Sequence, residues 1–285
     1  MKLPPHIILE VTTRCNYRCP FCYCVWHEFP ALSRPALDTA GWRSVIEECA
    51  EKGVKSLLFT GGEALLRKDI RDLLDYARAM LPEGDLSLFT NGSRLSDEVL
   101  RYLKRRRIRI ATSLQGLRTY GEMTGTHRSY RPLLRTIARA SELRWPLSVS
   151  ITVNKVNLSE AADMFIAVAL SHPASIQIGA MMAEGRGRSH PELMLTSAEW
   201  SSFKQQIREL PNCGVSYSFC DEFYCHCREY PAEWRMRFGW NVKPCAAGRD
   251  FGVIGPDGKF RKCLHTVEEM NWRERPVDVR RIPKR

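Results

Sequence analysis

"HIILEVTTRCNYRCPFCYCVW", residues 6–26, joins a short apolar run to four cysteines that lie within ten residues of one another. The apolar and β-branched residues of positions 6–12 predict a buried strand. The loop after this strand has the spacing C-x3-C-x2-C, formed by Cys15, Cys19 and Cys22, and Cys24 lies outside that spacing. Because the loop is short, its three thiols can converge on one small object. The stretch therefore predicts a strand whose C-terminal end carries a reactive site.

The strand at 6–12 is the first of six that alternate with helices. Further β-rich runs lie at 55–60, 85–91, 108–115, 147–153 and 175–181. Amphipathic stretches predict helices over 37–53, 67–81, 96–106, 129–143, 157–171 and 196–210. Strands that alternate with helices are typical of right-handed parallel crossovers. We therefore expect an α/β fold, an open partial (β/α)6 TIM-like barrel with its site at the C-terminal edge of the strands.

The alternation of strand and helix patterns ends at about residue 210. The stretch 211–230 is rich in cysteine and has no helical period, and "FGVI" and "KFRKC" then flank the turn sequence "GPDG" at 255–258. The second pattern predicts a β-hairpin. We expect a barrel core over 1–195, a connecting helix over 196–210, a small cysteine-rich extension over 211–270 and a basic tail over 271–285.

Composition limits the class of protein. The 285 residues include 11 cysteines, an odd number, and the N-terminus has no signal-peptide pattern. We therefore expect a cytoplasmic protein whose clustered thiols bind metal or do redox chemistry. No stretch reaches the roughly 18 apolar residues of a membrane span, so we expect no membrane partner.

The formal net charge of +11 could suit an acidic peptide, an anionic cofactor or nucleic acid. The densest basic run, Lys104–Ile110, has no interleaved aromatic residues. We interpret it as a solvated helix end that runs into a strand, and we expect no nucleic-acid partner.

The number of thiols in the first loop indicates the kind of metal. Structural zinc normally takes four ligands, whereas three thiolates around an iron–sulfur cube leave one iron without a protein ligand. The loop resembles the cluster loop of the radical S-adenosylmethionine (SAM) superfamily, in which an aromatic residue, here Phe21, precedes the third cysteine. The resemblance implies a [4Fe-4S] cluster with an open iron site that binds SAM. One electron then cleaves SAM to methionine and a 5′-deoxyadenosyl radical, which takes a hydrogen atom from the substrate. A zinc loop is the alternative.

The ends of later strands extend the resemblance. Gly61, Gly62 and Glu63 follow the second strand, and in the family this motif binds the amino group of SAM. Asn91 follows the third strand, where a plain polar turn is the alternative. Ser113 follows the fourth strand at a position that in the family lies near the ribose or carboxylate of SAM. Many members have an acidic residue two positions later, where this chain has Gln115.

Three weaker candidates complete the predicted cofactor-binding set. Arg128 could pair with the SAM carboxylate, although a simple surface arginine is an equal alternative. Asn154 follows the fifth strand, and Arg186 lies in a glycine–arginine stretch similar to the one beside the adenine or ribose in this family. The sequence identifies no catalytic residue. Cys24 is one hypothetical donor of a hydrogen atom.

A second group of cysteines surrounds the predicted hairpin. Cys245 and Cys263 have the spacing C-x12-G-x4-C, which resembles the opening of the SPASM and twitch extensions that hold auxiliary [4Fe-4S] clusters. No cysteine follows Cys263, which favours a shortened, twitch-like extension with one auxiliary cluster. Cys220, Cys225 and Cys227 are the candidates for its remaining ligands, ahead of Cys213. A four-cysteine zinc site is the alternative.

The resemblance covers most of the chain and indicates the reaction type. Enzymes with such extensions often crosslink, epimerise or oxidise ribosomally synthesised peptides, so we expect a peptide substrate. The alternative is a small-molecule or cofactor-biosynthesis enzyme, a decarboxylase or dehydrogenase; a zinc-containing nucleic-acid-binding protein is more distant. The reaction implies an external one-electron donor of the flavodoxin or ferredoxin type. Because the first strand begins near residue 6, we also expect a separate leader-peptide-binding protein.

Overall fold

The computed structural model describes the chain except for residues 1, 30–31, 33–36, 221–245, 268–271 and 273–285. Its described strands form a single sheet in the order β7-β6-β5-β4-β3-β2-β1-β8-β9. Adjacent strands from β7 to β8 pair in parallel, and only β8 and β9 are antiparallel. The strands are β1 (His6–Glu10), β2 (Ser56–Thr60), β3 (Asp85–Phe89), β4 (Ile108–Leu114), β5 (Leu147–Val153), β6 (Ser175–Ala180), β7 (Tyr217–Cys220), β8 (Phe251–Ile254) and β9 (Phe260–Arg261).

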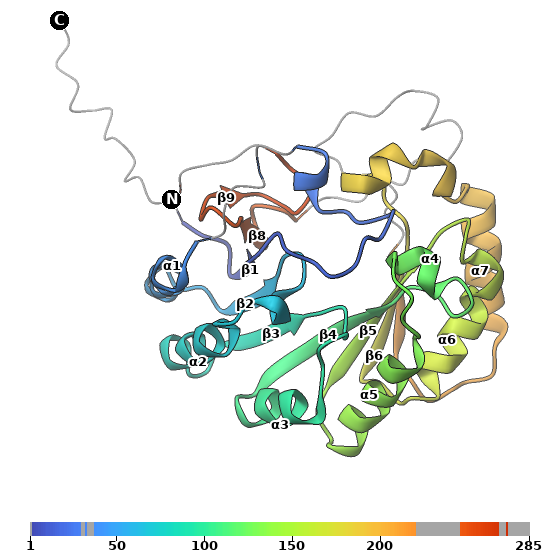
Figure 1. Cartoon of the computed structure of the whole chain (residues 1–285), viewed down its shortest axis with the longest axis horizontal. Coiled ribbons are helices and arrows are strands. Elements are labelled where there is room, and N and C mark those ends of the chain that lie inside the picture. Colours follow the sequence, from blue (N-terminus) through green and yellow to red (C-terminus); the bar gives the residue numbers. More distant parts are fainter. Residues whose placement is uncertain (1, 30–31, 33–36, 221–245, 268–271, 273–285) are drawn as a thin grey trace, which may run out of the picture.

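Helices surround the outer face of this curved sheet (Figure 1). They are α1 (Thr39–Glu51), α2 (Ile70–Met80), α3 (Asp97–Arg105), α4 (Tyr120–Thr124), α5 (Arg131–Glu142), α6 (Ala161–Ala169) and α7 (Ser197–Glu209). Local capping explains several helix starts: the side chains of Asp38, Ser96 and Thr196 each accept a hydrogen bond from a backbone N–H in the first turn. Short 3-10 helices occupy Val25–His27, Ala64–Leu66, Leu158–Glu160, Gly185–Ser189 and Pro191–Leu193.

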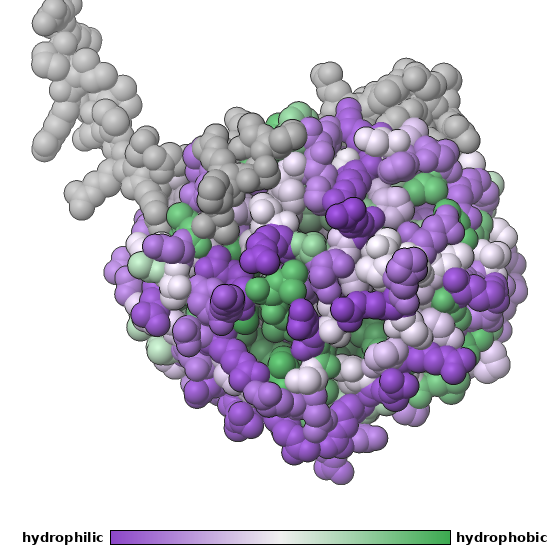
Figure 2. Space-filling view, viewed as in Figure 1, coloured by the Kyte–Doolittle hydropathy of each residue, from purple (hydrophilic) through white to green (hydrophobic). Residues whose placement is uncertain are grey.

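The two faces of the sheet differ in burial. Along β5, Leu147, Val149, Ile151 and Val153 are buried, whereas the alternate residues Ser148, Ser150 and Thr152 are partly exposed. Successive side chains of a strand point to opposite faces, so the apolar set packs under the helices and the hydroxyl set lines the inner face. Figure 2 shows the molecule hollowed in this view, with hydrophobic residues inside a hydrophilic rim. The inner face of the open barrel is therefore accessible.

The predicted architecture is confirmed, with two additions. The six strands and six helices lie where the sequence predicts them, and each is shorter than its predicted range or equal to it. The stretch 211–230, which has no helical period, contains β7, a seventh parallel strand. The second addition is the short helix α4, which follows β4. The predicted hairpin forms, and its first strand β8 pairs with β1. This pairing satisfies backbone groups that would otherwise be unpaired along β1.

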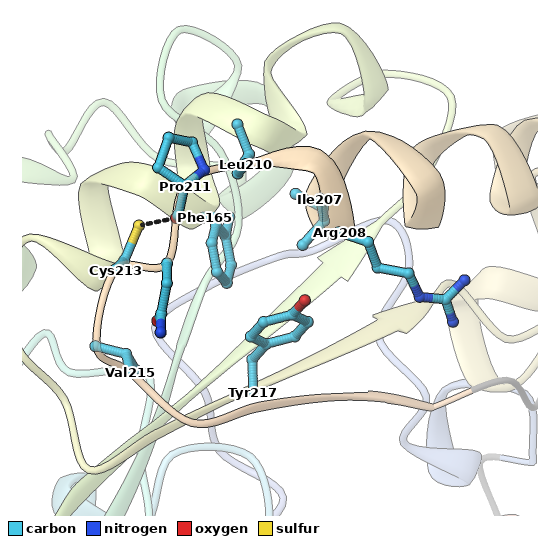
Figure 3. A pocket seen from close by; sticks show the side chains of 9 residues that line it. Phe165, Ile207, Arg208, Leu210, Pro211, Cys213, Val215 and Tyr217 are labelled. Carbon is cyan, nitrogen blue, oxygen red and sulfur yellow. Dashed lines mark hydrogen bonds between the residues drawn. The ribbon is translucent and has the colours of Figure 1, made fainter.

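A shallow cavity of about 330 Å³ lies between α6, α7 and the start of β7. Figure 3 shows Phe165 and Tyr217 on its walls, with Arg208 nearby, and the Cys213 thiol hydrogen-bonded to the Pro211 carbonyl at 3.2 Å. The cavity opens at the N-terminal end of β7, the opposite edge from the cysteine loop, so we assign it no part in the site. Within the described ranges, no helix has the length and apolar character needed to cross a membrane.

Candidate cluster and cofactor site

The cluster loop, residues 11–24, follows the C-terminal end of β1. Cys15 is exposed, Cys19 and Cys22 are partly buried, and all three are free thiols. In the part of the chain that the structure describes, no three His, Cys, Asp or Glu side chains are gathered closely enough to hold a single metal ion. The donor set itself fits an iron–sulfur cluster: three thiols of one short loop, each of which can bind a different iron.

Gly61 and Gly62 hold the cluster loop from one side. The backbone N–H of Gly62 donates to the Thr12 carbonyl at 2.7 Å, and that of Glu63 donates to the Arg14 carbonyl at 2.8 Å. A Cβ atom at Gly61 would lie 2.3 Å from the Thr12 carbonyl oxygen, and one at Gly62 would lie 2.3 Å from that of Arg14. The two glycines are therefore needed for the close approach of the β2 turn to the cluster loop. The sequence motif indicated a ligand contact and did not reveal this packing role.

Gly185 and Arg186 hold the same loop from the other side. Gly185 has a φ of +56°, and a Cβ there would lie 2.5 Å from the Cys22 carbonyl oxygen. The backbone N–H of Arg186 donates to that carbonyl at 2.9 Å. Phe21 is buried in the core on this side, and its Cα lies 3.8 Å from the Cβ position of Gly187. The structure thus brings the 185–187 stretch against the third cysteine, and its contact with the adenine or ribose of SAM stays a prediction.

Glu63 lies buried beside the loop with its carboxylate fixed by three donors. Its Oε1 accepts from the Thr90 hydroxyl at 2.7 Å and the Leu65 N–H at 3.0 Å, and its Oε2 accepts from the Asn91 N–H at 2.7 Å. Burial raises the pKa of this carboxyl, although the bonds from Asn91 and Thr90 oppose the shift. A buried carboxylate of this kind favours a cationic partner. Thr90 holds Glu63 directly; its position at the end of the third strand indicated a residue of the same site, with a plain polar turn as the alternative.

Asn91 connects the third strand to the cluster loop. Its Nδ2 donates to Asn16 Oδ1 at 2.9 Å and lies 4.0 Å from the Cys15 sulfur. Asn16 in turn donates to the Ser93 hydroxyl at 2.9 Å. Hydrogen bonds to cluster sulfurs are one of the means by which a protein tunes a cluster's potential. The predicted residue Asn91 therefore lies within the site.

The remaining cofactor candidates divide into two groups. Ser113 is buried, and its hydroxyl accepts a 2.6 Å hydrogen bond from Gln115 at the end of β4. Arg128 is exposed, and its charge acts on Tyr17 in the cluster loop. Asn154 is fully buried, and its Oδ1 accepts from the Val156 N–H at 2.9 Å, so its side chain holds the turn after β5. Arg128 therefore acts on the cluster loop through its charge, whereas the side chains of Ser113 and Asn154 are buried and bonded within the protein.

The thiols of the loop differ in their ionisation. Burial raises the pKa of Cys19 to about 12. A hydrogen bond from the Cys24 thiol holds the pKa of Cys22 well below its usual range, and the same bond, with burial, raises the pKa of Cys24. Cys24 also lies 3.8 Å from the Gly61 carbonyl. Cys24 thus lies beside Cys22, and its thiol donates to the Gly61 carbonyl.

The C-terminal hairpin reaches the back of the cluster loop. Arg261 on β9 forms an ion pair with Glu10 at the end of β1, and both side chains are buried. Cys263 is buried two residues further on, and the His265 ring contacts the Tyr23 ring edge-on at 5.7 Å. Burial raises the pKa of Glu10 to about 7 despite Arg261, and the charges of Cys22 and Cys263 add to the shift. Glu10 therefore lies near one cysteine of each predicted group.

The other predicted C-terminal ligands are only partly described. Cys225, Cys227 and Cys245 lie outside the described residues. Cys220 ends β7 at the C-terminal edge of the sheet, whereas Cys213 lies before β7 and lines the cavity at the opposite edge. This placement supports the preference for Cys220 over Cys213.

Comparisons with known proteins agree with this geometry. The family profile described as the radical SAM superfamily matches residues 9–166. The PqqA peptide cyclase of Xanthomonas oryzae pv. oryzae (strain MAFF 311018) is 32% identical over 285 residues, which cover 96% of this chain and 73% of the cyclase. The sporulation killing factor maturation protein SkfB of Bacillus subtilis (strain 168) is 27% identical over 189 residues, which cover 65% of this chain and 44% of SkfB.

Similarity in fold extends to a solved structure. Streptococcus suis SuiB, crystallised with the precursor peptide SuiA, superposes with a TM-score of 0.71 at 15% sequence identity. The superposition covers 93% of this chain, which spans about 60% of the length of SuiB. At this identity the likeness concerns the fold, and it confirms the open α/β barrel.

Proposed function

The chain belongs to the radical SAM superfamily, and from that premise we propose that it is an enzyme that modifies a ribosomally synthesised peptide. The observation that carries the proposal is the cluster loop itself. Three free thiols lie on a loop that Gly61–Gly62 and Gly185–Arg186 hold from two sides, with the buried carboxylate of Glu63 beside it. The family implies a [4Fe-4S] cluster and SAM.

We assign each part of that chemistry to residues of this chain. Cys15, Cys19 and Cys22 would hold the cluster. Bound together, the cluster and SAM supply a 5′-deoxyadenosyl radical that takes a hydrogen atom from the substrate. Glu63 would bind the SAM ammonium group, because its carboxylate is buried and already oriented by Thr90 and Asn91. A preoriented, water-excluded carboxylate attracts a cation more strongly than an exposed one does.

Ser113, Arg128 and Arg186 are the proposed contacts to the remaining polar groups of SAM. Ser113 is positioned by Gln115, and Arg186 is anchored through its backbone to Cys22. These residues come from β4, the segment after it and the segment after β6, so they approach the cluster loop from different strands. Their assignment rests on the family resemblance and on this placement.

A peptide is the substrate class that the chain favours. The relatives of this chain include a protein named as a PqqA peptide cyclase and one named as a maturation protein. The inner face of the barrel offers hydroxyl groups from Ser148, Ser150 and Thr152. Such groups can bind the N–H and C=O groups of an extended peptide backbone.

An auxiliary [4Fe-4S] cluster is part of the proposal. Its ligands would be Cys263 together with Cys220, Cys225, Cys227 and Cys245. Cys263 is fixed close to the cluster loop by the buried pair of Arg261 and Glu10. An external one-electron donor and a separate leader-peptide-binding protein belong to the same proposal. Because such clusters need a reducing environment, we place the enzyme in the cytoplasm.

The test compares the wild-type protein with a variant in which Cys15, Cys19 and Cys22 are all changed to Ala. Iron, sulfide and zinc are measured after anaerobic reconstitution, together with the electron paramagnetic resonance spectrum of the reduced protein. We expect the variant to keep about half of the iron and one cluster signal. A variant that retains only zinc or no metal would refute the auxiliary cluster, and a wild type without any cluster would refute the whole assignment.

The substrate class is tested separately. The reconstituted enzyme is incubated with SAM, dithionite and a short precursor peptide encoded beside its gene, and products are identified by mass spectrometry. We expect 5′-deoxyadenosine together with a peptide whose mass has changed. Formation of 5′-deoxyadenosine with every such peptide left unmodified would contradict a peptide substrate and leave the radical SAM chemistry intact.

A further inference from the structure

We propose that Arg14, Arg18 and Arg94 form a docking surface for an acidic one-electron carrier protein, directly over the exposed cluster ligand Cys15. The proposal rests on the proposed function, since it names where the required electron enters. The side chains of these three arginines are exposed and do not hold the cluster loop in place.

Two of the arginines flank Cys15 along the chain, and the third lies on a turn that is bonded to the same loop. Arg14 and Arg18 lie on either side of it in the cluster loop, and both are exposed. Arg94 is exposed in the turn after β3, and this turn is fixed to the loop through the hydrogen bonds of Asn16 with Ser93 and Asn91. Among the described free cysteines, Cys15 alone is exposed. The exposed cysteine therefore lies on the same loop as Arg14 and Arg18, next to the turn that carries Arg94.

The arginines of this surface form no ion pair with a carboxylate, although the charge of Arg94 acts on the buried Glu63. In the densest basic run of the chain, Arg106 pairs with Asp75 at 2.7 Å, Arg107 with Glu83 at 3.7 Å and Arg109 with Asp85 at 3.1 Å. By contrast, the side chains of Arg14, Arg18 and Arg94 form no ion pair with any described residue. Three arginines of that run are thus paired with carboxylates, whereas Arg14, Arg18 and Arg94 are not.

An uncompensated basic surface attracts an acidic partner and raises the rate of encounter. Electron-transfer complexes are small and short-lived, so a few steering charges suffice and no large apolar patch is needed. Charge complementarity over the exposed cluster ligand favours a carrier protein over an acidic peptide. A peptide substrate has to reach the barrel interior, where the accessible side chains of β5 are hydroxyls.

The step itself is a transfer of one electron. The reduced carrier is oxidised by one electron, and the oxidised cluster is reduced by one electron. No covalent bond forms or breaks, and no proton has to move. The role of the arginines is to hold the carrier's redox centre close to Cys15.

The experiment uses the reconstituted enzyme without SAM and a reduced bacterial flavodoxin as the acidic carrier. Stopped-flow absorbance gives the second-order rate constant for cluster reduction at low and at high salt, and calorimetry gives the affinity for oxidised flavodoxin. The variant is R18E/R94E. The matched control is R105E/R144E, which makes the same charge change at two exposed arginines without an ion pair in the described structure, at the N-terminal ends of β4 and β5.

We expect R18E/R94E to lower the rate constant by about tenfold or more at low salt, with a much smaller effect at high salt. The control should change the rate by no more than about twofold. The charge-preserving variant R18K/R94K should retain most of the rate and affinity, and it keeps the test valid if R18E/R94E loses its cluster. Reduction by dithionite should be equal in all proteins.

Three results would overturn the proposal. An equal loss in R18E/R94E and R105E/R144E would show that net charge acts without a defined surface. Unchanged reduction by flavodoxin in R18E/R94E, with weakened binding of an acidic peptide, would assign the surface to a peptide. Loss of flavodoxin affinity in R18K/R94K equal to that in R18E/R94E would exclude charge as the cause. Failure of the proposed function is distinguishable, since the wild type would then show no cluster for dithionite to reduce.

Discussion

Arg261 forms a buried ion pair with Glu10, although the two residues are 251 positions apart. The guanidinium also donates to the Thr266 carbonyl at 3.1 Å. One side chain therefore joins the end of the first strand, the hairpin of the extension and the backbone after Cys263. Breaking a buried pair by removing one partner leaves an uncompensated charge, so this contact anchors the extension to the barrel next to the cluster loop.

Changing Glu10 to Gln should alter how stability depends on pH. The pKa of Glu10 is about 7 in the folded protein because burial outweighs the attraction of Arg261, and its ordinary value is 4.5. Below about pH 4.5 the group is protonated in both the folded and the unfolded state and contributes no pH dependence. Between about 4.5 and 7 only the unfolded state releases the proton, so the free energy of unfolding falls as the pH rises.

The measurement is urea unfolding of the cluster-free, reduced protein at about pH 5 and about pH 8. Relative to E10Q, the wild type should lose about 3 kcal/mol between these values. Parallel pH profiles for the two proteins would contradict the prediction.

Changing Gly62 to Ala should impair the cluster loop. The added Cβ would lie 2.3 Å from the Arg14 carbonyl oxygen, so the loop has to move away from the β2 turn. Overpacking of this kind costs about 1–3 kcal/mol. We expect a lower free energy of unfolding and reduced iron content after reconstitution.

Gly255→Ala is the matched control for G62A. A Cβ at Gly255 would meet its nearest atom, Asp257 Oδ1, at 3.4 Å, an ordinary contact. Iron content should be unchanged in this variant. Equal iron loading in G62A and wild type would show that the close approach of the glycine turn is not needed for cluster binding.

Cys22 and Cys24 should differ in a direct test of cluster ligation. Cys22→Ala should abolish the N-terminal cluster, because it removes one of the three proposed ligands. Cys24→Ala should retain the cluster and shift its reduction potential, because the Cys24 thiol lies beside Cys22 and lowers its pKa. The measurements are iron content and a potentiometric titration followed by electron paramagnetic resonance. Loss of iron in C24A, with retention in C22A, would reverse the assignment.

Changing Glu160 to Ala should destabilise the segment after β4. The carboxylate of Glu160 is buried and accepts hydrogen bonds from the Leu117 N–H at 2.8 Å, the Arg118 N–H at 2.8 Å and the Thr119 hydroxyl at 2.5 Å. Each buried donor left without a partner costs about 1–3 kcal/mol. We expect a loss of at least about 2 kcal/mol in the free energy of unfolding, with Glu122→Ala on the exposed face of α4 as the control.

The pH dependence of this site has the opposite sign to that of Glu10. Burial alone would raise the pKa of Glu160, but the hydrogen bonds from Thr119 and the backbone lower it below its ordinary value. The stabilisation is therefore present above that ordinary value and is lost as the pH falls through the folded-state pKa. A wild type and an E160A variant that converge in stability at low pH would support this account, and a constant difference would contradict it.

The local signals of this chain predicted much of its structure. Period-two and helical patterns located the six alternating units, since each strand buries one face and each helix one stripe. The turn "GPDG" located the hairpin from its backbone preferences alone. β7 was missed because it is short, and all four of its residues are exposed or only partly buried, so it shows no strong apolar period.

The candidate site was predictable to a similar degree. The spacing of the loop cysteines and the Gly-Gly-Glu turn both indicate a specific chemistry. In the structure the loop with Cys15, Cys19 and Cys22 lies against that turn. Thr90, Asn16 and Arg261 have no such pattern, and each acquires its role from a partner distant in sequence. Asn154 also lies at a strand end, where its side chain is bonded to its own turn, and its contact with the cofactor stays a prediction.

Residues close together along the chain specify the alternating α/β units, the three-cysteine loop after the first strand and the superfamily to which the chain belongs. Contacts between distant segments are responsible for the packing of the two glycines against the cluster loop, the pairing of the hairpin with β1 and the burial of Arg261 on Glu10. They also set which arginines form ion pairs. Such contacts depend on which strands become neighbours, and that choice is made by packing over the whole chain rather than by any local pattern.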